Sequence, residues 1–237
     1  MTTFFISDLH LDDRRPETTR LLMQFLQEEA VNADALYILG DLFEYWLGDD
    51  VPSQCATQVA RALTSLADKG VPCYFMHGNR DFLLRDAYAR QAGMTLLPEA
   101  HVADLYGEQV LLMHGDSLCT DDAPYQQFRT LVRNPAWQAE FLTKTPQKRL
   151  QVAMQARDAS AEHKDNVDMG IMDVNQGEVV AAFERHGVQK MIHGHTHRPA
   201  THELEANGKP GQRIVLGDWY TQSSVLRVTP GNFDLQR

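Results

Sequence analysis

Histidine, aspartate and asparagine side chains gather in five short clusters that span most of the chain. These residue types hold divalent metal ions through oxygen and imidazole nitrogen atoms, and no cluster contains a cysteine. Such a donor set suits Mn²⁺, Fe²⁺, Mg²⁺ or Zn²⁺ rather than an iron–sulfur cluster or a structural zinc site. The clusters are Asp8-Leu9-His10, Gly40-Asp41, Gly78-Asn79-Arg80-Asp81, His114-Gly115-Asp116 and His193-Gly194-His195-Thr196-His197.

Each cluster has an ordinary explanation when it is taken singly. Asp-x-His occurs in surface loops, and Gly-Asp or Gly-Asn is common in turns that precede a helix. A buried histidine is also more often a core residue than a metal ligand. The spacing adds one geometric indication, because alternate residues of an extended chain face the same side. Asp8 pairs in this way with His10, and His195 pairs with His197.

The position of the clusters makes a shared site the better explanation. Each of the five follows a short apolar run with the composition of a β-strand, at residues 4–6, 35–39, 73–76, 110–113 and 190–192. The sites of open α/β sheets lie at the carboxyl ends of their strands. We therefore predict that the clusters converge and supply seven metal ligands, too many for one ion and enough for two. The predicted ligands are Asp8, His10, Asp41, Asn79, His114, His195 and His197.

Asp41 is our choice for a carboxylate that bridges the two ions. Two cations held ~3.5 to 4 Å apart in this way can activate a water molecule and stabilise the oxygens of an in-line phosphoryl reaction. The residues thus indicate a two-metal phosphoesterase that hydrolyses a phosphate ester or a phosphoanhydride.

Helical periodicity fills most of the gaps between the strand-like runs. Apolar residues share one helix face after Pro16, before Gly70 and before Gly187. The alternation of strands and helices predicts an α/β fold, in which a β-sandwich or mixed sheet is flanked by helices. Two further strands, at residues 213–217 and 225–228, are expected to add to it in antiparallel orientation.

Residues 122–175 break this alternation, and we predict that they form a helical cap inserted into a core made of residues 1–121 and 176–237. Between Tyr125 and Lys164 the sequence has seven Lys and Arg against three Asp and Glu, a local balance of +4 in an acidic chain. A basic, apolar-rich insertion suits an anionic lipid, although a helical hairpin with solvated bases would have the same composition. The apolar residues expected to line an acyl pocket are Tyr125, Phe128, Phe141, Val152 and Met154.

The composition argues against several classes of protein. A formal net charge of -10 disfavours sequence-independent binding to nucleic acid, and 43% hydrophobic residues disfavour a disordered chain. Three cysteines without CxxC spacing favour a reducing compartment. The first residues lack the basic start of a signal peptide, and no apolar run reaches the ~20 residues that cross a bilayer. We expect a cytoplasmic monomer that is able to touch a membrane surface.

The order Asp-x-His, Gly-Asp, Gly-Asn, His-Gly and Gly-His-x-His resembles the calcineurin-like metallophosphoesterase superfamily. Many members have a histidine after Gly-Asn, whereas this chain has Arg80, which cannot donate a proton usefully but can hold a phosphate through two hydrogen bonds. The resemblance implies that Asp8, His10, Asp41 and His197 hold one ion, and that Asp41, Asn79, His114 and His195 hold the other. It implies catalytic roles for the second of these groups.

Longer strings, at residues 33–44, 77–83, 114–122, 171–175 and 193–199, closely resemble the UDP-2,3-diacylglucosamine hydrolases of lipid A biosynthesis, and the likeness covers nearly the whole chain. It implies that water attacks the α-phosphorus of that lipid-linked nucleotide and yields UMP and 2,3-diacylglucosamine 1-phosphate (lipid X). It further implies two Mn²⁺ per chain and a peripheral position on the cytoplasmic face of the inner membrane, reached through the cap.

The same resemblance implies that the cap holds the acyl chains and the glucosamine. This region departs from the family pattern, because Lys164 stands where Asn is common among relatives and Val167 stands where Lys is common. The implied substrate contacts are Asn79, Arg80, Asp122, Ser160, Lys164, Val167 and His195.

Two alternatives share parts of this pattern. A protein phosphatase or a dinucleoside polyphosphate hydrolase would use the same metal set. Such enzymes would favour Gly-Asn-His over Gly-Asn-Arg, and they would not need an apolar cap. A non-catalytic scaffold on the same fold is the second alternative, and the presence of every ligand counts against it.

Overall fold

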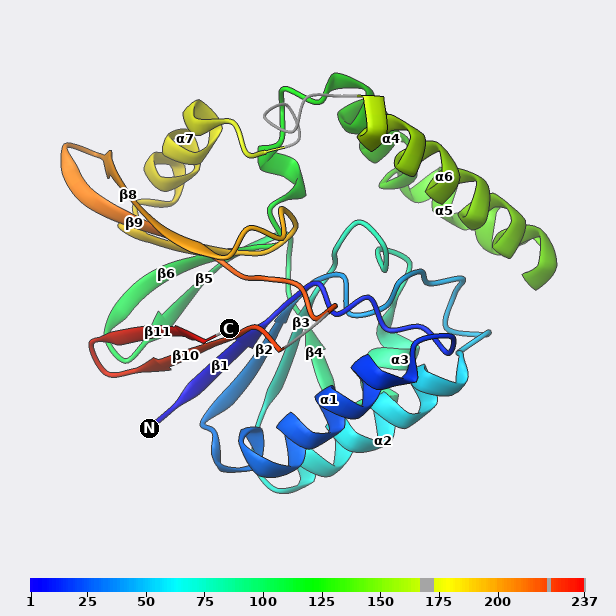
Figure 1. The fold of residues 1–237 in the computed structure, drawn as a ribbon, viewed down its shortest axis with the longest axis horizontal. Helices are drawn as coiled ribbons and strands as arrows, with labels where there is room; N and C mark the ends of the chain where they lie inside the picture. Colours follow the sequence, from blue (N-terminus) through cyan, green and yellow to red (C-terminus); the bar gives the residue numbers. More distant parts are fainter. Residues whose placement is uncertain (167–172, 221–222, 237) are drawn as a thin grey trace.

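Two β-sheets lie face to face at the centre of the protein in the computed structural model, which describes residues 1–166, 173–220 and 223–236 (Figure 1). The first sheet has the strand order β11-β10-β1-β2-β3-β4. Strands β1 to β4 are parallel, and β10 and β11 continue the sheet in antiparallel orientation beside β1. The bounds are β1 Thr3–Ile6, β2 Ala35–Leu39, β3 Cys73–Met76, β4 Met94–Leu96, β10 Val225–Thr229 and β11 Asn232–Gln236.

The second sheet has the order β5-β6-β7-β9-β8. Its three inner strands, β6, β7 and β9, are parallel, while β5 and β8 pair with their neighbours in antiparallel orientation at the two edges. The bounds are β5 Ala100–Leu105, β6 Glu108–Met113, β7 Lys190–His193, β8 Ala200–Ala206 and β9 Lys209–Val215.

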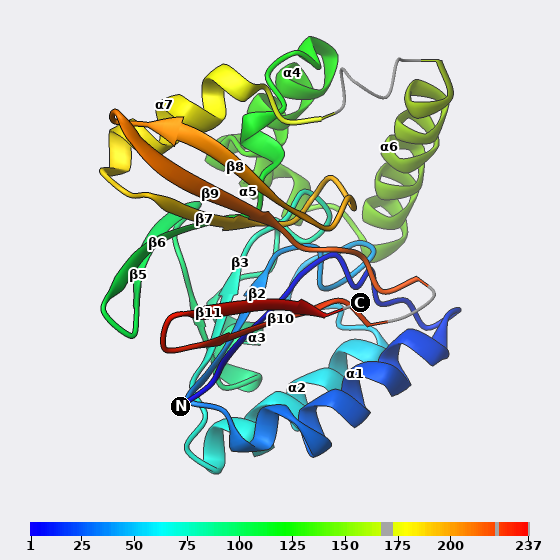
Figure 2. The same ribbon diagram turned by 60° about the vertical axis from the view of Figure 1, so that its left-hand side comes forward.

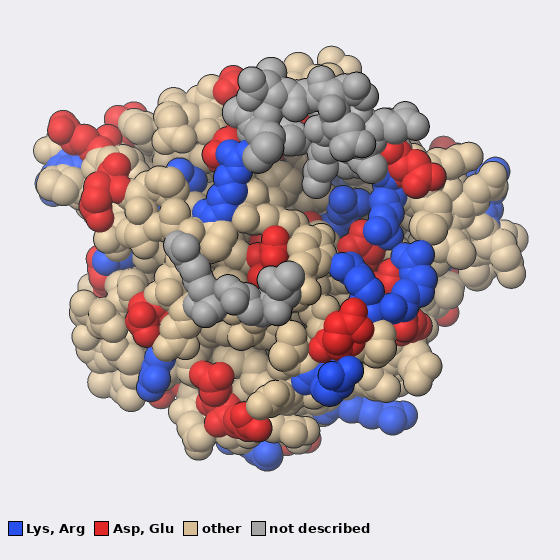
Figure 3. Space-filling model, in the orientation of Figure 1, with Lys and Arg blue, Asp and Glu red and all other residues tan. Residues whose placement is uncertain are grey.

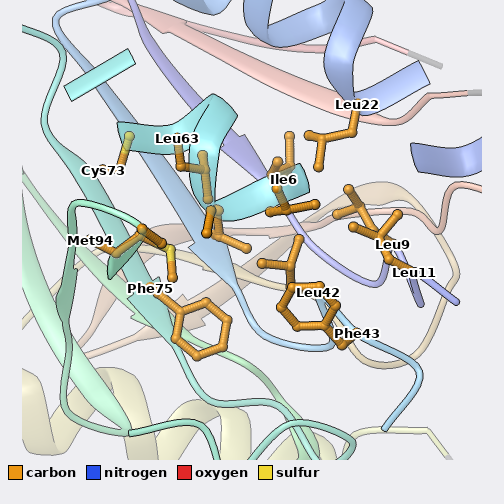
Figure 4. Close-up of a cluster of buried hydrophobic side chains, with 14 of the residues drawn as sticks. Ile6, Leu9, Leu11, Leu22, Leu42, Phe43, Leu63, Cys73, Phe75 and Met94 are labelled. Carbon is orange, nitrogen blue, oxygen red and sulfur yellow. The ribbon is translucent and has the colours of Figure 1, made fainter. Parts of the chain in front are cut away.

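Successive side chains of a strand point to opposite faces, and this alternation decides which layer each one enters. Phe5 and Ile192 are fully buried between the two sheets. The neighbouring Ile6 faces the other way and packs with Leu22 and Leu63 of the helices that cover the first sheet (Figure 4). These helices are α1 Pro16–Glu28, α2 Gln54–Asp68 and α3 Asp86–Gln91.

Helix α7 (Gln176–His186) covers the outer face of the second sheet, where Phe183 packs against Met191 of β7. The helix begins after Asn175, whose side chain accepts a hydrogen bond from the backbone N–H of Glu178. It ends at Gly187, which adopts a left-handed conformation with φ 65°. Two short 3-10 helices, η1 Ala30–Asn32 and η2 Asp116–Leu118, complete the connections.

Helices α4 (Ala123–Val132), α5 (Pro135–Leu142) and α6 (Pro146–Asn166) follow one another without an intervening strand. In Figures 1 and 2 they lie beyond the ends of β1, β2 and β3, far from the N-terminus. Arg149 of α6 is buried and fixes this group of helices to the core, because its guanidinium donates to both carboxylate oxygens of Asp50 at 2.6 and 2.9 Å. It also donates to the carbonyl of Leu47.

The predicted sandwich with flanking helices is confirmed, and so are the five strands that precede the clusters. Helices occupy residues 123–166 as expected, while the division into core and cap stays a prediction. Strands β4, β5, β8 and β11 were not predicted. Strand β9 was expected in antiparallel orientation, but it pairs in parallel with β7 and is antiparallel only to β8. In the described part of the chain, no helix is both long and apolar enough to cross a membrane.

Candidate metal centre

All seven predicted ligands lie in loops that follow strands, at the end of the sandwich where the parallel strands of both sheets finish. Asp8 and His10 follow β1, Asp41 follows β2 and Asn79 follows β3. The second sheet supplies His114 after β6, and both His195 and His197 after β7. The two sheets therefore contribute opposite sides of one centre.

One group of ligands surrounds the side chain of Asp8. The Nε2 atom of His197 lies 3.3 Å from Asp8 Oδ1 and 3.2 Å from His10 Nε2. The same nitrogen of His10 lies 3.8 Å from Asp41 Oδ2. Oxygen and imidazole donors of Asp8, His10 and His197 are thus close enough together to hold one ion.

A second group lies on the other side of Asp41. Its Oδ1 atom is 3.8 Å from His114 Nε2. The amide oxygen of Asn79 lies 3.1 Å from His114 Nε2 and 2.9 Å from His195 Nδ1. The two carboxylate oxygens of Asp41 therefore face different groups of ligands, which is the geometry that a bridging carboxylate requires.

The donor atoms of this centre are arranged to bind cations rather than to form hydrogen bonds with one another. Asp8 is fully buried, and its Oδ1 atom has no hydrogen-bond partner. The facing Nε2 atoms of His10 and His197 leave no room for two protons between them. Although burial alone would lower it, the neighbouring carboxylates of Asp218 and Asp8 raise the pKa of His197 to about 10. The carboxylates around His197 therefore favour a positive charge in this centre, which a bound cation would supply.

Groups behind the ligands hold the imidazole rings in place, and sequence patterns did not reveal them. Asp218 Oδ2 lies 3.1 Å from His197 Nδ1, and Glu44 Oε2 lies 3.3 Å from His10 Nδ1. Partners of this kind orient ligating histidines and raise their basicity. Asp218 had a signal that could have found it, because Gly217-Asp218 follows strand β9 just as Gly40-Asp41 follows β2.

Asp81 joins the loop after β2 to the loop after β3. Its fully buried carboxylate accepts backbone N–H bonds from Gly78 at 2.9 Å and Leu42 at 2.8 Å, with longer bonds from Asp41 and Phe43 at 3.3 Å. Burial and the nearby charge of Asp41 raise the pKa of Asp81. This residue positions two ligand loops without lying among the ligands.

The backbone at the ligand positions is unusual. Five of the seven ligands have positive φ angles, a region that Asp and His enter more readily than most residues. Gly78 permits the close approach of the two loops, because a Cβ atom at this position would lie 2.0 Å from Asp41 Oδ1. The angles are 55° for Asp8, 50° for His10, 51° for Asp41, 69° for His195 and 55° for His197.

Helix α4 borders the centre through a small set of polar contacts. Tyr125 donates its hydroxyl hydrogen to Asp116 at 3.0 Å, and its ring stacks on His195 with centroids 5.8 Å apart. Arg129 donates to the same carboxylate of Asp116 at 2.8 Å. Arg133 donates to the carbonyl of Gly78 at 2.9 Å. Helix α4 is thereby held beside Asn79 and His195.

A small crevice of about 10 Å³ lies between α4 and the loop after β3. Phe82, Tyr125, Phe128 and Val132 give it an apolar wall, and Asn79 of the metal centre lies at its edge. Phe128 is 43% exposed, so its ring is available to a ligand. The full lining is Asn79, Phe82, Asp116, Tyr125, Phe128, Arg129, Val132 and Arg133.

The predicted substrate contacts are only partly brought together. Arg80 lies beside the centre, where its backbone N–H donates to Asp41 Oδ1 at 2.8 Å. Asp122 caps helix α4 by accepting from the backbone of Tyr125. Ser160 and Lys164 belong to α6, but their side chains are outside the described part of the structure, and Val167 lies outside the described residues altogether.

Phe141 does not border the crevice. It is 4% exposed, belongs to the hydrophobic core and stacks on Trp137 with ring centroids 5.1 Å apart. Val152 packs against the same core. The apolar residues of α4 to α6 therefore divide between the core and the crevice, a division that the sequence did not reveal.

Comparisons with known proteins show the family to which the chain is similar. The family model for calcineurin-like phosphoesterases matches residues 1–199. The chain is 57% identical to a protein named UDP-2,3-diacylglucosamine hydrolase from Stenotrophomonas maltophilia (strain K279a), over 99% of this chain and 98% of the relative. It is 54% identical to a protein of the same name from Escherichia coli O157:H7 (strain EC4115 / EHEC), with the same coverage.

A solved structure of an archaeal phosphodiesterase has the same fold. The two share 12% sequence identity at a TM-score of 0.51, and the match covers 100% of this chain and 98% of the other. At this identity the likeness concerns the fold alone.

Proposed function

The chain belongs to the calcineurin-like phosphoesterase family, and from this premise we propose that it is an enzyme that hydrolyses the pyrophosphate bond of UDP-2,3-diacylglucosamine. The products are UMP and 2,3-diacylglucosamine 1-phosphate, and the reaction serves lipid A biosynthesis. One observation carries the proposal: donor groups for two ions lie next to Arg80 and to a small crevice with a partly apolar lining. A substrate with a diphosphate and acyl chains needs cationic groups for the diphosphate and apolar surface for the acyl chains.

Two divalent cations, for which we propose Mn²⁺, are assigned to the two groups of ligands, with Asp41 shared between them. When bound, they supply positive charge at the diphosphate and lower the pKa of the water that attacks the α-phosphorus. Asp218 and Glu44 keep His197 and His10 turned toward the centre. Asn79 and His195 lie between the centre and the crevice, where they would also contact the substrate.

Arg80 is assigned to hold the phosphate. Its backbone is fixed by Asp41, while its Nε atom is buried without a hydrogen-bond partner. A guanidinium can bind two phosphate oxygens at once, but it does not act as a proton donor. A phosphoanhydride suits this arrangement, because the departing phosphate is stable as an anion. Hydrolysis of a serine or threonine phosphate would gain from a proton donor, so Arg80 counts against a protein phosphatase.

The crevice favours the lipid as substrate over a dinucleoside polyphosphate, which is also a phosphoanhydride. Its exposed ring, Phe128, offers apolar surface to an acyl chain, and Arg129 and Arg133, which both pair with Asp116, border it. Asp122, Ser160, Lys164 and Val167 are further proposed contacts of the sugar and phosphate. A scaffold without catalytic activity would require neither the complete ligand set nor this crevice.

We also propose that the protein works as a monomer on the cytoplasmic face of the inner membrane, held there peripherally through α4 to α6, without nucleic acid as a partner. Phe128 and Leu131 of α4 and Leu150 of α6 are exposed apolar residues on these helices. Figure 3 shows Lys and Arg side chains gathered below α6, with Asp and Glu among them. Apolar residues beside bases suit the surface of an anionic membrane.

The reaction is tested by identifying its products. Purified protein loaded with Mn²⁺ is incubated in ¹⁸O-labelled water with either UDP-2,3-diacylglucosamine or a dinucleoside tetraphosphate. Mass spectrometry is expected to find UMP carrying the label and unlabelled lipid phosphate from the first substrate, with little reaction of the second. Label in the lipid phosphate would contradict attack on the α-phosphorus, and preference for the tetraphosphate would contradict the substrate.

The role of the crevice is tested with Phe128→Ala. Because burial of a Phe ring contributes ~1.5–3 kcal/mol, kcat/KM for the diacylated substrate should fall by roughly 10-fold or more. A small chromogenic phosphodiester, which engages only the metal centre, should be hydrolysed as before. Gln127→Ala is the matched control, since Gln127 lies on the same helix, is exposed and does not line the crevice. Equal losses on both substrates would exclude acyl binding by Phe128.

A further inference from the structure

A second cavity, lined in part by polar side chains, lies behind the loop that carries His195 and His197. Thr196, the residue between these two ligands, lines the cavity together with Arg198, Asp173, His202 and Arg213. Its volume is about 250 Å³. None of the seven predicted metal ligands is among the described residues that line it. The cavity is therefore distinct from the metal centre, although one loop borders both.

Arg213 is the most unusual residue of this cavity. It lies on β9, paired with His202 of the edge strand β8, and it is 4% exposed. Its Nη1 atom donates to His193 Nε2 at 3.0 Å, while its Nε atom is buried without a partner. Among the residues that the structure describes, no carboxylate forms an ion pair with it. The guanidinium is thus a buried cation that lacks a direct counter-charge.

His193 cannot supply the missing negative charge. An imidazole ring is neutral or positively charged, so it does not act as a counter-ion for a guanidinium. The Nδ1 atom of His193 lies 2.8 Å from the carbonyl of Gly194, which fixes the proton there and leaves Nε2 to accept from Arg213. Since arginine does not lose its proton in proteins, the charge of Arg213 persists. A buried charge of this kind is costly unless another group compensates it.

The other polar groups of the cavity suit an anion. The hydroxyl of Thr196 is buried and has no hydrogen-bond partner among the residues that the structure describes. The carboxylate of Asp173 is engaged by Arg198 at 2.7 Å. Among the described residues that line the cavity, the charged side chains are Arg198, Arg213 and Asp173. The volume lies below the ~300–1,000 Å³ of sites for larger organic ligands, which favours a small ligand.

We propose that this cavity binds a phosphate group, with the Arg213 guanidinium and the Thr196 hydroxyl as donors. The phosphate would come from free inorganic phosphate or from a nucleoside monophosphate, because both present the same oxyanion. Binding here does not depend on the proposed reaction. A bound anion would stiffen the loop from Thr196 to Ala200, which begins between two metal ligands.

The proposal is tested by calorimetric titration of the Mn²⁺-loaded protein with inorganic phosphate and, separately, with UMP. All variants keep the metal centre and any phosphate that binds there. A difference in binding stoichiometry between variants therefore reports the site in this cavity. The wild type should bind one more phosphate than Arg213→Met, which removes the charge at similar side-chain length. Arg227→Met is the matched control, because Arg227 is an exposed arginine on strand β10 and should leave the stoichiometry unchanged.

The two ligands distinguish the source of the phosphate. Loss of UMP binding in Arg213→Met assigns the cavity to a nucleotide phosphate, whereas loss of inorganic phosphate alone assigns it to free phosphate. If neither ligand loses a site, the proposal is wrong. Thr196→Val provides a second variant of nearly the same shape, and it should weaken the additional site by roughly 10-fold or more, because a hydrogen bond to a charged group is lost.

Thermal unfolding separates anion binding from a merely structural role of Arg213. In chloride buffer Arg213→Met should unfold at the same temperature as the wild type or higher, because a buried uncompensated charge has been removed. Phosphate should raise the midpoint of the wild type more than that of the variant. Equal destabilisation of the variant in both buffers would show that Arg213 only supports the fold.

Discussion

Replacing Asp41 with asparagine is expected to lower kcat/KM by ~10³-fold or more, because bound cations contribute several kcal/mol to such reactions and each 1.4 kcal/mol is a factor of ten. The amide keeps the shape of the side chain. One oxygen can still accept from the N–H of Arg80, which now lies at 2.8 Å. Asparagine also tolerates the φ of 51° at this position. What is lost is the charge and one of the two oxygens that face the ligand groups.

Metal content and unfolding are measured along with activity. Asp41→Asn should retain fewer ions after dialysis than the wild type, while its unfolding in the presence of a chelator should be unchanged. Asp234→Asn, on the exposed edge strand β11, makes the same chemical change away from the site and should alter neither quantity. A variant that kept both ions and near wild-type turnover would exclude Asp41 as the bridge.

Asp81→Ala is expected to lower the free energy of unfolding by about 3–5 kcal/mol. Removing this carboxylate leaves four backbone N–H groups without their acceptor, in a place that water does not reach. Each buried donor left unsatisfied costs ~1–3 kcal/mol, and the loops would relax enough to recover part of the total. Turnover should fall as well, because Asp41 and Asn79 lie in the two loops that Asp81 joins.

Urea unfolding in the presence of a chelator measures this effect without a contribution from bound ions. Asp81→Asn should be intermediate, because its amide oxygen still accepts while its NH₂ group opposes the remaining donors. Asp68→Ala, at the exposed end of α2, is the control and should change stability by less than ~1 kcal/mol. A similarly small effect of Asp81→Ala would mean that the loops are held together by other contacts.

The sequence predicted where the loops of the proposed ligands lie, because each of these residues follows its strand closely in the chain. Strand β3, for example, is a run of apolar residues that ends directly before Gly78-Asn79. Strands such as β8 were missed because their sequence is polar: Thr201-His202-Glu203 shows no apolar alternation. An edge strand with a mostly exposed surface has little apolar signal to find.

Residues that act across large sequence separations were also missed. Asp81 and Asp218 resemble ordinary turn or cap residues until the fold shows which backbone groups and which imidazole they face. Phe141 and Phe128 have the same apolar character and lie in neighbouring helices, yet one belongs to the core and the other borders the crevice. Composition indicates that a side chain will avoid water, but packing decides whether it contacts the protein interior or a ligand.

The path of the chain through the first sheet affects when the metal centre can form during synthesis. Strand β1 is made first, but one of its two neighbours in the sheet is β10, which is made near the end. The ligands likewise run from Asp8 to His197. A growing chain therefore carries an open strand edge and an incomplete set of ligands until most of it has left the ribosome. If the centre binds two ions as proposed, their uptake should come late, after most of the chain has folded.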